Sequence, residues 1–268
     1  MHEAPARGRP LLAHGGAAMT PPTRRDTGVR YGIARVMSKR GLCSRSEAER
    51  LVRAGRVRLD GRPVLDPERP ADPQRARIEI DGAATGAAVP LFLALNKPRG
   101  LVCTARDERG RDTVFRCFEG AGLPHVAPVG RLDQASEGLL LFSNDPVWAA
   151  GITAPQTGPV KTYRVQVDRP VDDERLCAIG AGAVDAGEVL GVHAVRLLRD
   201  NPRTAWLEIE LHEGRNRHIR RLLAAHGLGV LRLVRVAIGP VALGDLAKGQ
   251  WRALDPAEVD ALRSPGSA

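Results

Sequence analysis

The sequence predicts an α+β protein, in which a small αα-β module precedes a larger domain built on a mixed, mainly antiparallel sheet. In the last two thirds of the chain, candidate strands outnumber candidate helices and do not alternate strictly with them, which argues against a doubly wound sheet. Nearer the N-terminus, two short helical segments are followed by a hairpin turn. The 268 residues suffice for one small and one large domain, and a hydrophobic content of 43% supports a core.

Changes in composition divide the chain into four parts. Residues 1–30 are rich in Ala, Gly, Pro and Arg without periodicity, so we expect a disordered basic tail. A transit peptide would have a similar Arg-rich, acid-poor start, but a disordered tail explains it as well. The αα-β module is expected over residues 31–82, a linker over 83–90 and the larger domain over 91–263.

The αα-β module is predicted from its helix and turn signals. A short helix is expected over residues 33–40. Ser44 precedes a second helix and has Glu47 three residues on, which is the spacing of a capping box. Asp60-Gly61 lies between two short candidate strands and is typical of a tight hairpin turn.

The larger domain is predicted to begin with the apolar run 91–95, a buried strand that ends at Lys97-Pro98. Further strands are expected at 138–143, 161–167, 205–211 and 228–238, and helices near 172–180 and 216–226.

The basic charge of the chain is concentrated in the small module. The whole chain has 40 Lys and Arg residues against 31 Asp and Glu, a net charge of +9, with an isoelectric point near 10.2. Residues 35–62 contain nine basic and three acidic residues, a net of +6, whereas residues 91–268 contain 23 and 21. A solvated basic surface would give the same total, but charge confined to one module indicates a polyanionic partner such as RNA.

Several classes of protein are not expected from this sequence. The four cysteines, at positions 43, 103, 117 and 177, show no C-x-x-C spacing, so we expect free thiols in a reducing cytoplasm and no metal site. No apolar run is long enough to span a membrane, and the first residues lack the core of a signal peptide. Nucleotide, dinucleotide, zinc-protease and serine-hydrolase motifs are absent, so no cofactor is expected.

Three segments contain residues suited to one site: "GRLDQASEGLLLFSND" (130–145), "KTYRVQVD" (161–168) and "EGRNRHIRRLLAAHG" (213–227). In the first, Asp133 lies at the mouth of a buried strand, where a carboxylate is costly unless it is paired. In the second, alternation places Tyr163 on the core-facing side of a strand.

In the third segment, helical spacing groups Arg217, Arg220 and Arg221 on one face. Together the three segments could assemble one pocket. Taken singly, the acid could cap a loop, the tyrosine could be an ordinary core residue and the arginines could be a solvated helix face.

The three segments, in this order, resemble the active-site motifs of the RsuA/RluB/RluE/RluF group of bacterial ribosomal RNA pseudouridine synthases. Residues 231–254 resemble the C-terminal strand signature of that group, and "SRSEAERLVRAGRVRLDG" resembles the S4 RNA-binding domain that commonly precedes it. The resemblance covers residues 33–262. This chain departs from the pattern at Asp60 in place of Asn, at His218 in place of Gln and at Leu222 in place of Met.

The resemblance implies a role for each candidate residue. Asp133 would be the catalytic carboxylate that enables cleavage of the uridine N1–C1′ bond, either as a nucleophile or as a base toward the ribose. Tyr163 would stack on the uracil, Arg220 would pair with Asp133, and Arg131 would also bind the substrate. The remaining candidates would contact RNA: Ser44, Arg45, Arg50, Arg217 and Arg221.

The implied function is isomerisation of one uridine in ribosomal RNA, with 23S favoured over 16S rRNA. The expected partner is ribosomal RNA or a ribosomal subunit precursor, and we expect a cytoplasmic monomer that needs no cofactor or metal. The alternative is a non-catalytic ribosome assembly factor that binds RNA through its S4 domain. An S4-bearing stress protein that binds RNA is a weaker alternative, since it would not need residues 91–262.

Overall fold

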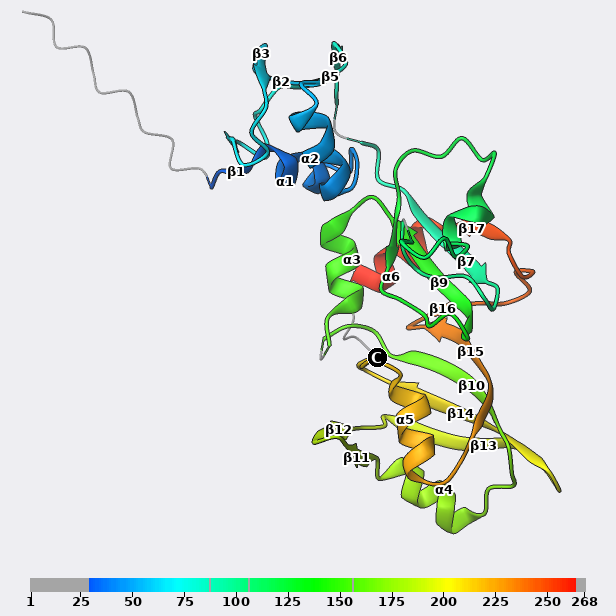
Figure 1. Cartoon of the computed structure of the whole chain (residues 1–268). Helices are drawn as coiled ribbons and strands as arrows, with labels where there is room; N and C mark the ends of the chain where they lie inside the picture. Colours follow the sequence, from blue (N-terminus) through cyan, green and yellow to red (C-terminus); the bar gives the residue numbers. More distant parts are fainter. Residues whose placement is uncertain (1–28, 87, 106, 156, 264–268) are drawn as a thin grey trace, which may run out of the picture.

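The computed structural model describes residues 29–86, 88–105, 107–155 and 157–263 of the chain (Figure 1). The expected disordered tail over residues 1–30 falls outside these ranges except for its last two residues. Within the described ranges, no helix has both the length and the apolar character needed to cross a membrane.

The N-terminal module has two helices packed on a small sheet, with a hydrophobic core of its own (Figure 1). Its helices are α1 (Ile33–Lys39) and α2 (Arg45–Arg53). Its strands are β1 (Tyr31–Gly32), β2 (Val57–Leu59), β3 (Arg62–Val64), β4 (Pro70–Ala71), β5 (Ile78–Ile80) and β6 (Ala83–Ala84). Four of these strands form a sheet in the order β3-β2-β5-β6. Its edge strand β6 lies within residues 83–90, the segment that was expected to be a linker.

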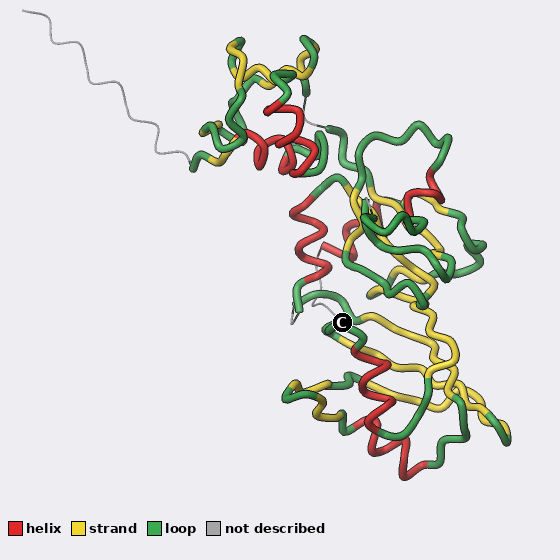
Figure 2. Tube along the Cα trace, viewed as in Figure 1, coloured by secondary structure: helices red, strands yellow, loops and turns green. Residues whose placement is uncertain are grey.

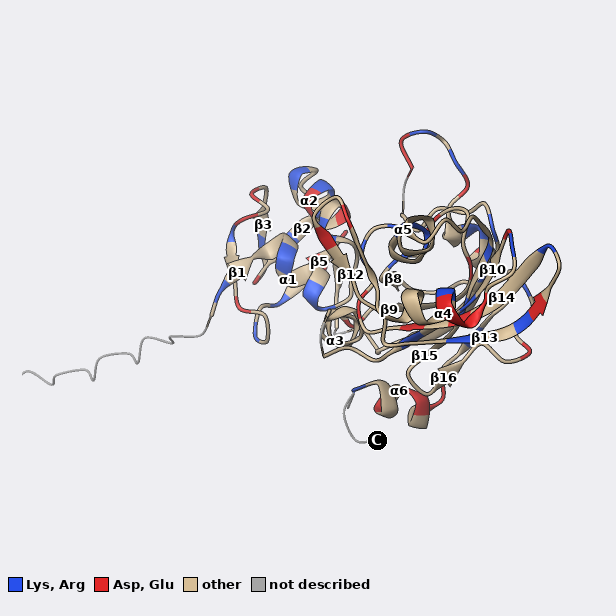
Figure 3. Ribbon diagram, turned by 90° about the horizontal axis from the view of Figure 1, so that it is seen from below, with Lys and Arg blue, Asp and Glu red and all other residues tan. Residues whose placement is uncertain are grey.

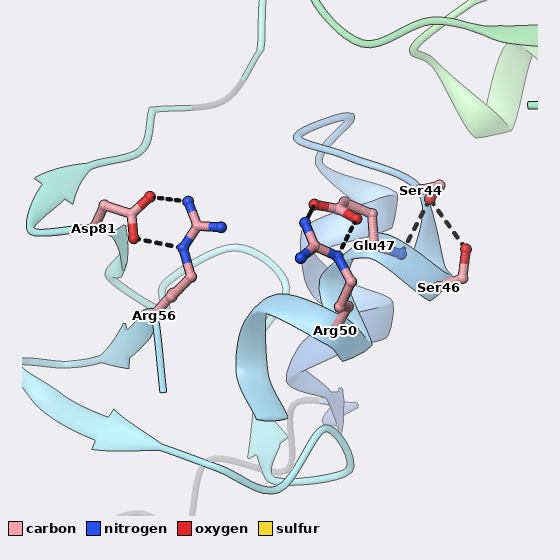
Figure 4. Close-up of polar contacts among 6 residues, drawn as sticks. All are labelled: Ser44, Ser46, Glu47, Arg50, Arg56 and Asp81. Carbon is pink, nitrogen blue, oxygen red and sulfur yellow. Dashed lines mark hydrogen bonds and ion pairs between the residues drawn. The ribbon is translucent and has the colours of Figure 1, made fainter. Parts of the chain in front are cut away.

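The predicted helix start and hairpin turn form, but the capping box forms only in part. The Ser44 hydroxyl accepts a hydrogen bond from the Glu47 amide at 3.1 Å, which begins α2. The Glu47 carboxylate does not return to the cap; it binds both ends of the Arg50 guanidinium, at 2.8 and 2.5 Å (Figure 4). Asp60 and Gly61 have φ angles of 51° and 79°, as the turn between β2 and β3 requires.

The larger domain is built on a nine-stranded sheet, and every pairing in it is antiparallel except the short β9–β15 pair. Figure 2 draws its strands in yellow. The order is β13-β14-β10-β15-β9-β7-β17, with β16 beside β15 and β8 beside β9. The strands are β7 (Phe92–Lys97), β8 (Ala127–Val129), β9 (Glu137–Ser143), β10 (Lys161–Val167), β13 (Ala194–Asn201), β14 (Thr204–Leu211), β15 (Val230–Ile238), β16 (Val241–Ala242) and β17 (Trp251–Ala253). The predicted α+β fold class is confirmed.

Helices cover this sheet in two groups (Figure 1). α4 (Asp173–Gly180) and α5 (His218–Ala225) lie against the half formed by β10, β13, β14 and β15, and α3 (Pro146–Thr153) and α6 (Pro256–Arg263) pack beside the other half. The remaining elements are a 3-10 turn, η1 (Val114–Phe118), and a separate hairpin of β11 (Ala183–Asp185) and β12 (Glu188–Leu190).

Strand β9 is buried along its whole length because cores form on both of its faces. Leu140 and Phe142 belong to the core beneath α4 and α5, while Leu139 and Leu141 belong to the core that includes α3 and α6. This explains the unbroken apolar run, since a strand covered on both sides has no polar face.

One glycine of β9 generates a stability prediction. Gly138 has a φ of +102°, and a Cβ there would lie 2.3 Å from the carbonyl oxygen of Arg235 on β15. Gly138→Ala should therefore lower the free energy of unfolding by about 3 kcal/mol or more, as measured by urea denaturation. Gly151→Ala is the control, because nothing lies within 4 Å of its added Cβ in α3, and it should be stabilising by roughly 0.5–1 kcal/mol. A wild-type unfolding midpoint for Gly138→Ala would contradict this account.

Candidate active site

Residues of all three predicted segments line one small cavity of about 80 Å³, called here the Asp133 cavity. Asp133 is half-buried in the loop that enters β9, and Tyr163 comes from β10. Arg217 and Arg220 come from the start of α5, and the exposed Arg131 lies at the mouth of the loop. The structure thus brings together five of the predicted site residues.

The Asp133 loop is held by a lysine whose role the sequence did not predict. Lys97, the last residue of β7, is fully buried. Its ammonium donates hydrogen bonds to the carbonyl oxygens of Pro98, Asp133 and Ser136, at 3.0, 3.3 and 2.8 Å. Burial lowers the pKa of Lys97, and the nearby charge of Asp133 opposes that shift. One buried charge therefore ties the loop to the end of β7.

The predicted orientation of Tyr163 is confirmed. Tyr163, Val165 and Val167 are buried on one face of β10, whereas Arg164 on the other face is exposed. Tyr163 is only 8% exposed and lies directly opposite Arg235 on β15. Its ring is thus held in the core at the wall of the Asp133 cavity.

The expected ion pair between Arg220 and Asp133 does not form. The Arg220 guanidinium donates instead to the carbonyl oxygens of Ala135, at 3.3 Å, and Val230, at 3.4 Å, and its buried Nε has no partner. Burial lowers the pKa of Arg220, the positive charge of Arg217 adds to that shift, and Asp133 opposes it. One carbonyl of the Asp133 loop and one of β15 take the donors that were expected to reach the carboxylate, so the two charged groups interact only across the cavity.

Arg221 does not join the other two arginines. Its guanidinium binds Asp185 and Glu188, which flank the turn of the β11–β12 hairpin, with Nη1 at 2.5 Å from Glu188. The prediction that Arg217, Arg220 and Arg221 share one face is therefore wrong for Arg221. Arg217 precedes α5 and has a left-handed φ of 51°, so helical spacing does not place it beside Arg221, whose side chain is held by the neighbouring carboxylates.

His218 is buried at the edge of the Asp133 cavity. Its Nε2 lies 2.9 Å from the carbonyl oxygen of Gly191, which requires Nε2 to carry the proton, and its Nδ1 is buried without a partner. Burial lowers the pKa of His218, which favours the neutral ring. The histidine thus fastens the start of α5 to the loop after β12.

The three candidate RNA contacts of the small module lie at the start and on the exposed side of α2. Arg45 pairs with Glu68 at 3.1 Å, and Arg50 pairs with Glu47 (Figure 4). Ser44 is occupied by its role as helix cap. Exposed ion pairs of this kind contribute little free energy, so both guanidinium groups can exchange their partners for phosphate. Figure 3 shows further basic residues along α1 and α2.

No group of three or more His, Cys, Asp or Glu side chains that could hold a metal ion occurs among the described residues.

The comparisons with known proteins agree with this geometry. Residues 91–225 match the family model described as RNA pseudouridylate synthase, and residues 32–74 match the S4 domain. The chain is 38% identical over 244 residues to an uncharacterized RNA pseudouridine synthase of Mycobacterium bovis, covering 90% of this chain and 95% of the relative. It is 34% identical over 232 residues to one of Aquifex aeolicus, covering 86% and 92%. A crystal structure of a pseudouridylate synthase superimposes with a TM-score of 0.61 and 28% identity, covering 87% of this chain and 99% of the other.

The Lys97 contacts generate a prediction. Lys97→Met leaves three carbonyl oxygens near the site without their donor, so it should lower the free energy of unfolding by about 2–4 kcal/mol. It should also speed hydrogen exchange of the Ser136 amide, which bonds to the Asp133 carbonyl. Lys248→Met is the control: Lys248 is largely exposed, and Arg232 still pairs with their shared partner Glu137, so the cost should stay below about 1 kcal/mol. Equal costs for the two variants would show that Lys97 does not anchor the loop.

Proposed function

The chain belongs to the RNA pseudouridine synthase family, with the N-terminal S4 domain of its RsuA-like members, and we propose that Asp133 converts a uridine of ribosomal RNA to pseudouridine. The observation that carries this assignment is the shared cavity: Asp133, on a loop fixed by Lys97, lies in the same cavity as Tyr163 and Arg220.

The cavity offers the groups that the isomerisation needs. The uridine leaves its stack and enters with its ribose toward Asp133, which acts at the sugar as nucleophile or base while the N1–C1′ bond breaks. The uracil then rotates, a C5–C1′ bond forms as any bond between Asp133 and the sugar breaks, and loss of the proton on C5 is balanced by protonation of N1, so that the product is an isomer of uridine. Tyr163 supplies an aromatic wall for the turning ring, and Arg217 and Arg220 supply positive charge at the cavity for the RNA backbone.

RNA binding is shared with the N-terminal module. Its nine basic residues over 35–62, against three acidic ones, make it the electrostatic anchor on structured RNA. Ser44, Arg45 and Arg50 are proposed as contacts at the start of α2, and Arg131 and Arg217 as contacts at the Asp133 cavity. The protein is proposed to act as a cytoplasmic monomer on ribosomal RNA or a subunit precursor.

The identity of the catalytic group can be tested directly. Asp133→Asn keeps the size of the side chain but removes its charge, so pseudouridine formation should fall by about a thousandfold or more. RNA affinity should stay near wild type, because phosphate contacts elsewhere supply most of it. Mass mapping of product RNA and a binding titration measure the two effects. Asp260 is an exposed acid of α6, so the control variant Asp260→Asn should keep both pseudouridine formation and RNA affinity.

Retained isomerisation in Asp133→Asn would remove this residue from the mechanism. A wild-type protein that binds ribosomal RNA tightly but isomerises no uridine would instead support a non-catalytic assembly factor.

The proposed target is a uridine of 23S rather than 16S rRNA. Pseudouridine mapping of both RNAs from a strain that lacks the gene should show one 23S position reverting to uridine, and the wild-type gene should restore it. The Asp133→Asn gene should fail to restore that position. Reversion at a 16S position would overturn the choice of subunit while leaving the activity in place.

A further inference from the structure

A second cavity, of about 230 Å³, adjoins the Asp133 cavity and has no part in the chemistry above. The two cavities share four lining residues: Arg131, Tyr163, Gly214 and Arg215. The second one is also lined by Lys161 of β10 and Arg235 of β15, and it is called here the Lys161 cavity.

Arg235 is a buried cation without a counter-ion. It is 5% exposed, and it forms no ion pair with any carboxylate of the residues that the structure describes. Its Nε donates to the carbonyl oxygen of Leu139 at 2.7 Å, while its Nη2 is buried without a hydrogen-bond partner. An unpaired buried guanidinium is costly, so its retention calls for an anion that pairs with it during function.

Lys161 adds a second positive charge to the same wall. It lies two residues before Tyr163, hence on the same face of β10, and Tyr163 is the register partner of Arg235. The Lys161 ammonium donates to the carbonyl oxygen of His212 at 3.0 Å and has no carboxylate partner within the described ranges. Burial, and then the charge of Arg235, lower the pKa of Lys161 to about 8.

Glu213, the one acidic residue that the described part of the chain contributes to the lining of the Lys161 cavity, does not neutralise Lys161 and Arg235. Glu213 lines the cavity but is bound to Arg215 at 2.9 Å. With Arg131 at the shared rim, Lys161 and Arg235 leave the wall with a net positive charge beside the Asp133 cavity.

We propose that the Lys161 cavity binds a backbone phosphate of the RNA, next to the uridine held at Asp133, through Lys161 and Arg235. The inference deepens the proposed function and rests on it. A phosphodiester offers the unbridged oxygens that a guanidinium and an ammonium bind, and the shared wall lets a single strand place its base in one cavity and its phosphate in the other. Register is thereby fixed: the nucleotide that enters the Asp133 cavity is the one whose neighbouring phosphate reaches Lys161.

The site can be tested without RNA or turnover, using sulfate as a tetrahedral anion. Sulfate titrated at constant ionic strength should raise the melting temperature of the wild type in a saturable way, and Lys161→Gln should weaken that binding roughly tenfold. Lys161→Arg keeps the charge and should restore it. Arg164→Gln is the matched control, because Arg164 lies on the opposite face of β10 and pairs with Glu208.

A second arm uses ribosomal RNA and separates the phosphodiester from a free anion. Lys161→Gln should flatten the log–log salt dependence of RNA binding by about 0.7 to 0.9 units, the loss of one phosphate contact, and Arg164→Gln should not. Loss of sulfate binding with an unchanged RNA slope would mean that the site takes a free anion, which overturns the RNA assignment.

Two further outcomes bear on the proposal. Equal sulfate binding by the wild type and by folded Lys161→Gln and Arg235→Gln would overturn the anion site itself. If the wild type isomerises no uridine but Lys161→Gln loses both sulfate binding and one phosphate contact's share of the salt dependence, the phosphate site stands and the catalytic assignment falls.

Discussion

The buried ammonium of Lys97 is the contact on which the candidate site depends. It joins the end of β7 to the loop before β9 through three backbone carbonyls, one of them that of Asp133. A buried lysine is stable in the interior only if its donors are satisfied, so movement of the loop would leave the ammonium buried without its hydrogen-bond partners. The backbone position of Asp133, and with it that of the proposed catalytic carboxylate, is therefore set by the hydrogen bonds of Lys97.

The sheet supplies the rest of the site through the pairing of β10 with β15. The register between these strands shifts between Thr162 and Tyr163, and beyond that shift Tyr163 lies opposite Arg235. The aromatic ring of Tyr163, the buried guanidinium of Arg235 and the Lys161 ammonium are consequently carried by two adjacent strands. Each strand is paired on both sides, because β14 lies beside β10 and β9 lies beside β15. The loop that carries Arg131 and Asp133 and the segment from Gly214 to Arg220 complete the two cavities, so the strands provide only part of the lining that the cavities share.

Local patterns predicted local structure well, whereas side-chain pairing could not be predicted. Alternation placed Tyr163 on the correct face, and the Asp60-Gly61 turn formed as expected, because both depend on a few adjacent residues. The edge strand β13 was missed, since only Val195 and Leu197 pack on the core, and only partly, while its other residues are exposed. The partners of Arg220 and the anchoring role of Lys97 depend on carbonyl groups up to 85 residues away in sequence, which no periodicity reports. Arg221 was misplaced for the same reason.

The burial of β9 on both faces limits how such a scaffold can be altered. A strand whose every side chain is enclosed accepts only replacements of similar volume, so a change of volume in β9 would disturb the cores on both of its faces. The β11–β12 hairpin tolerates changes of sequence and length better than β9. The Arg221 guanidinium pairs with Asp185 and Glu188, one on each side of its turn, and the tip between them can be lengthened without touching either core. Insertions are therefore better accommodated at this tip than in the buried strand β9.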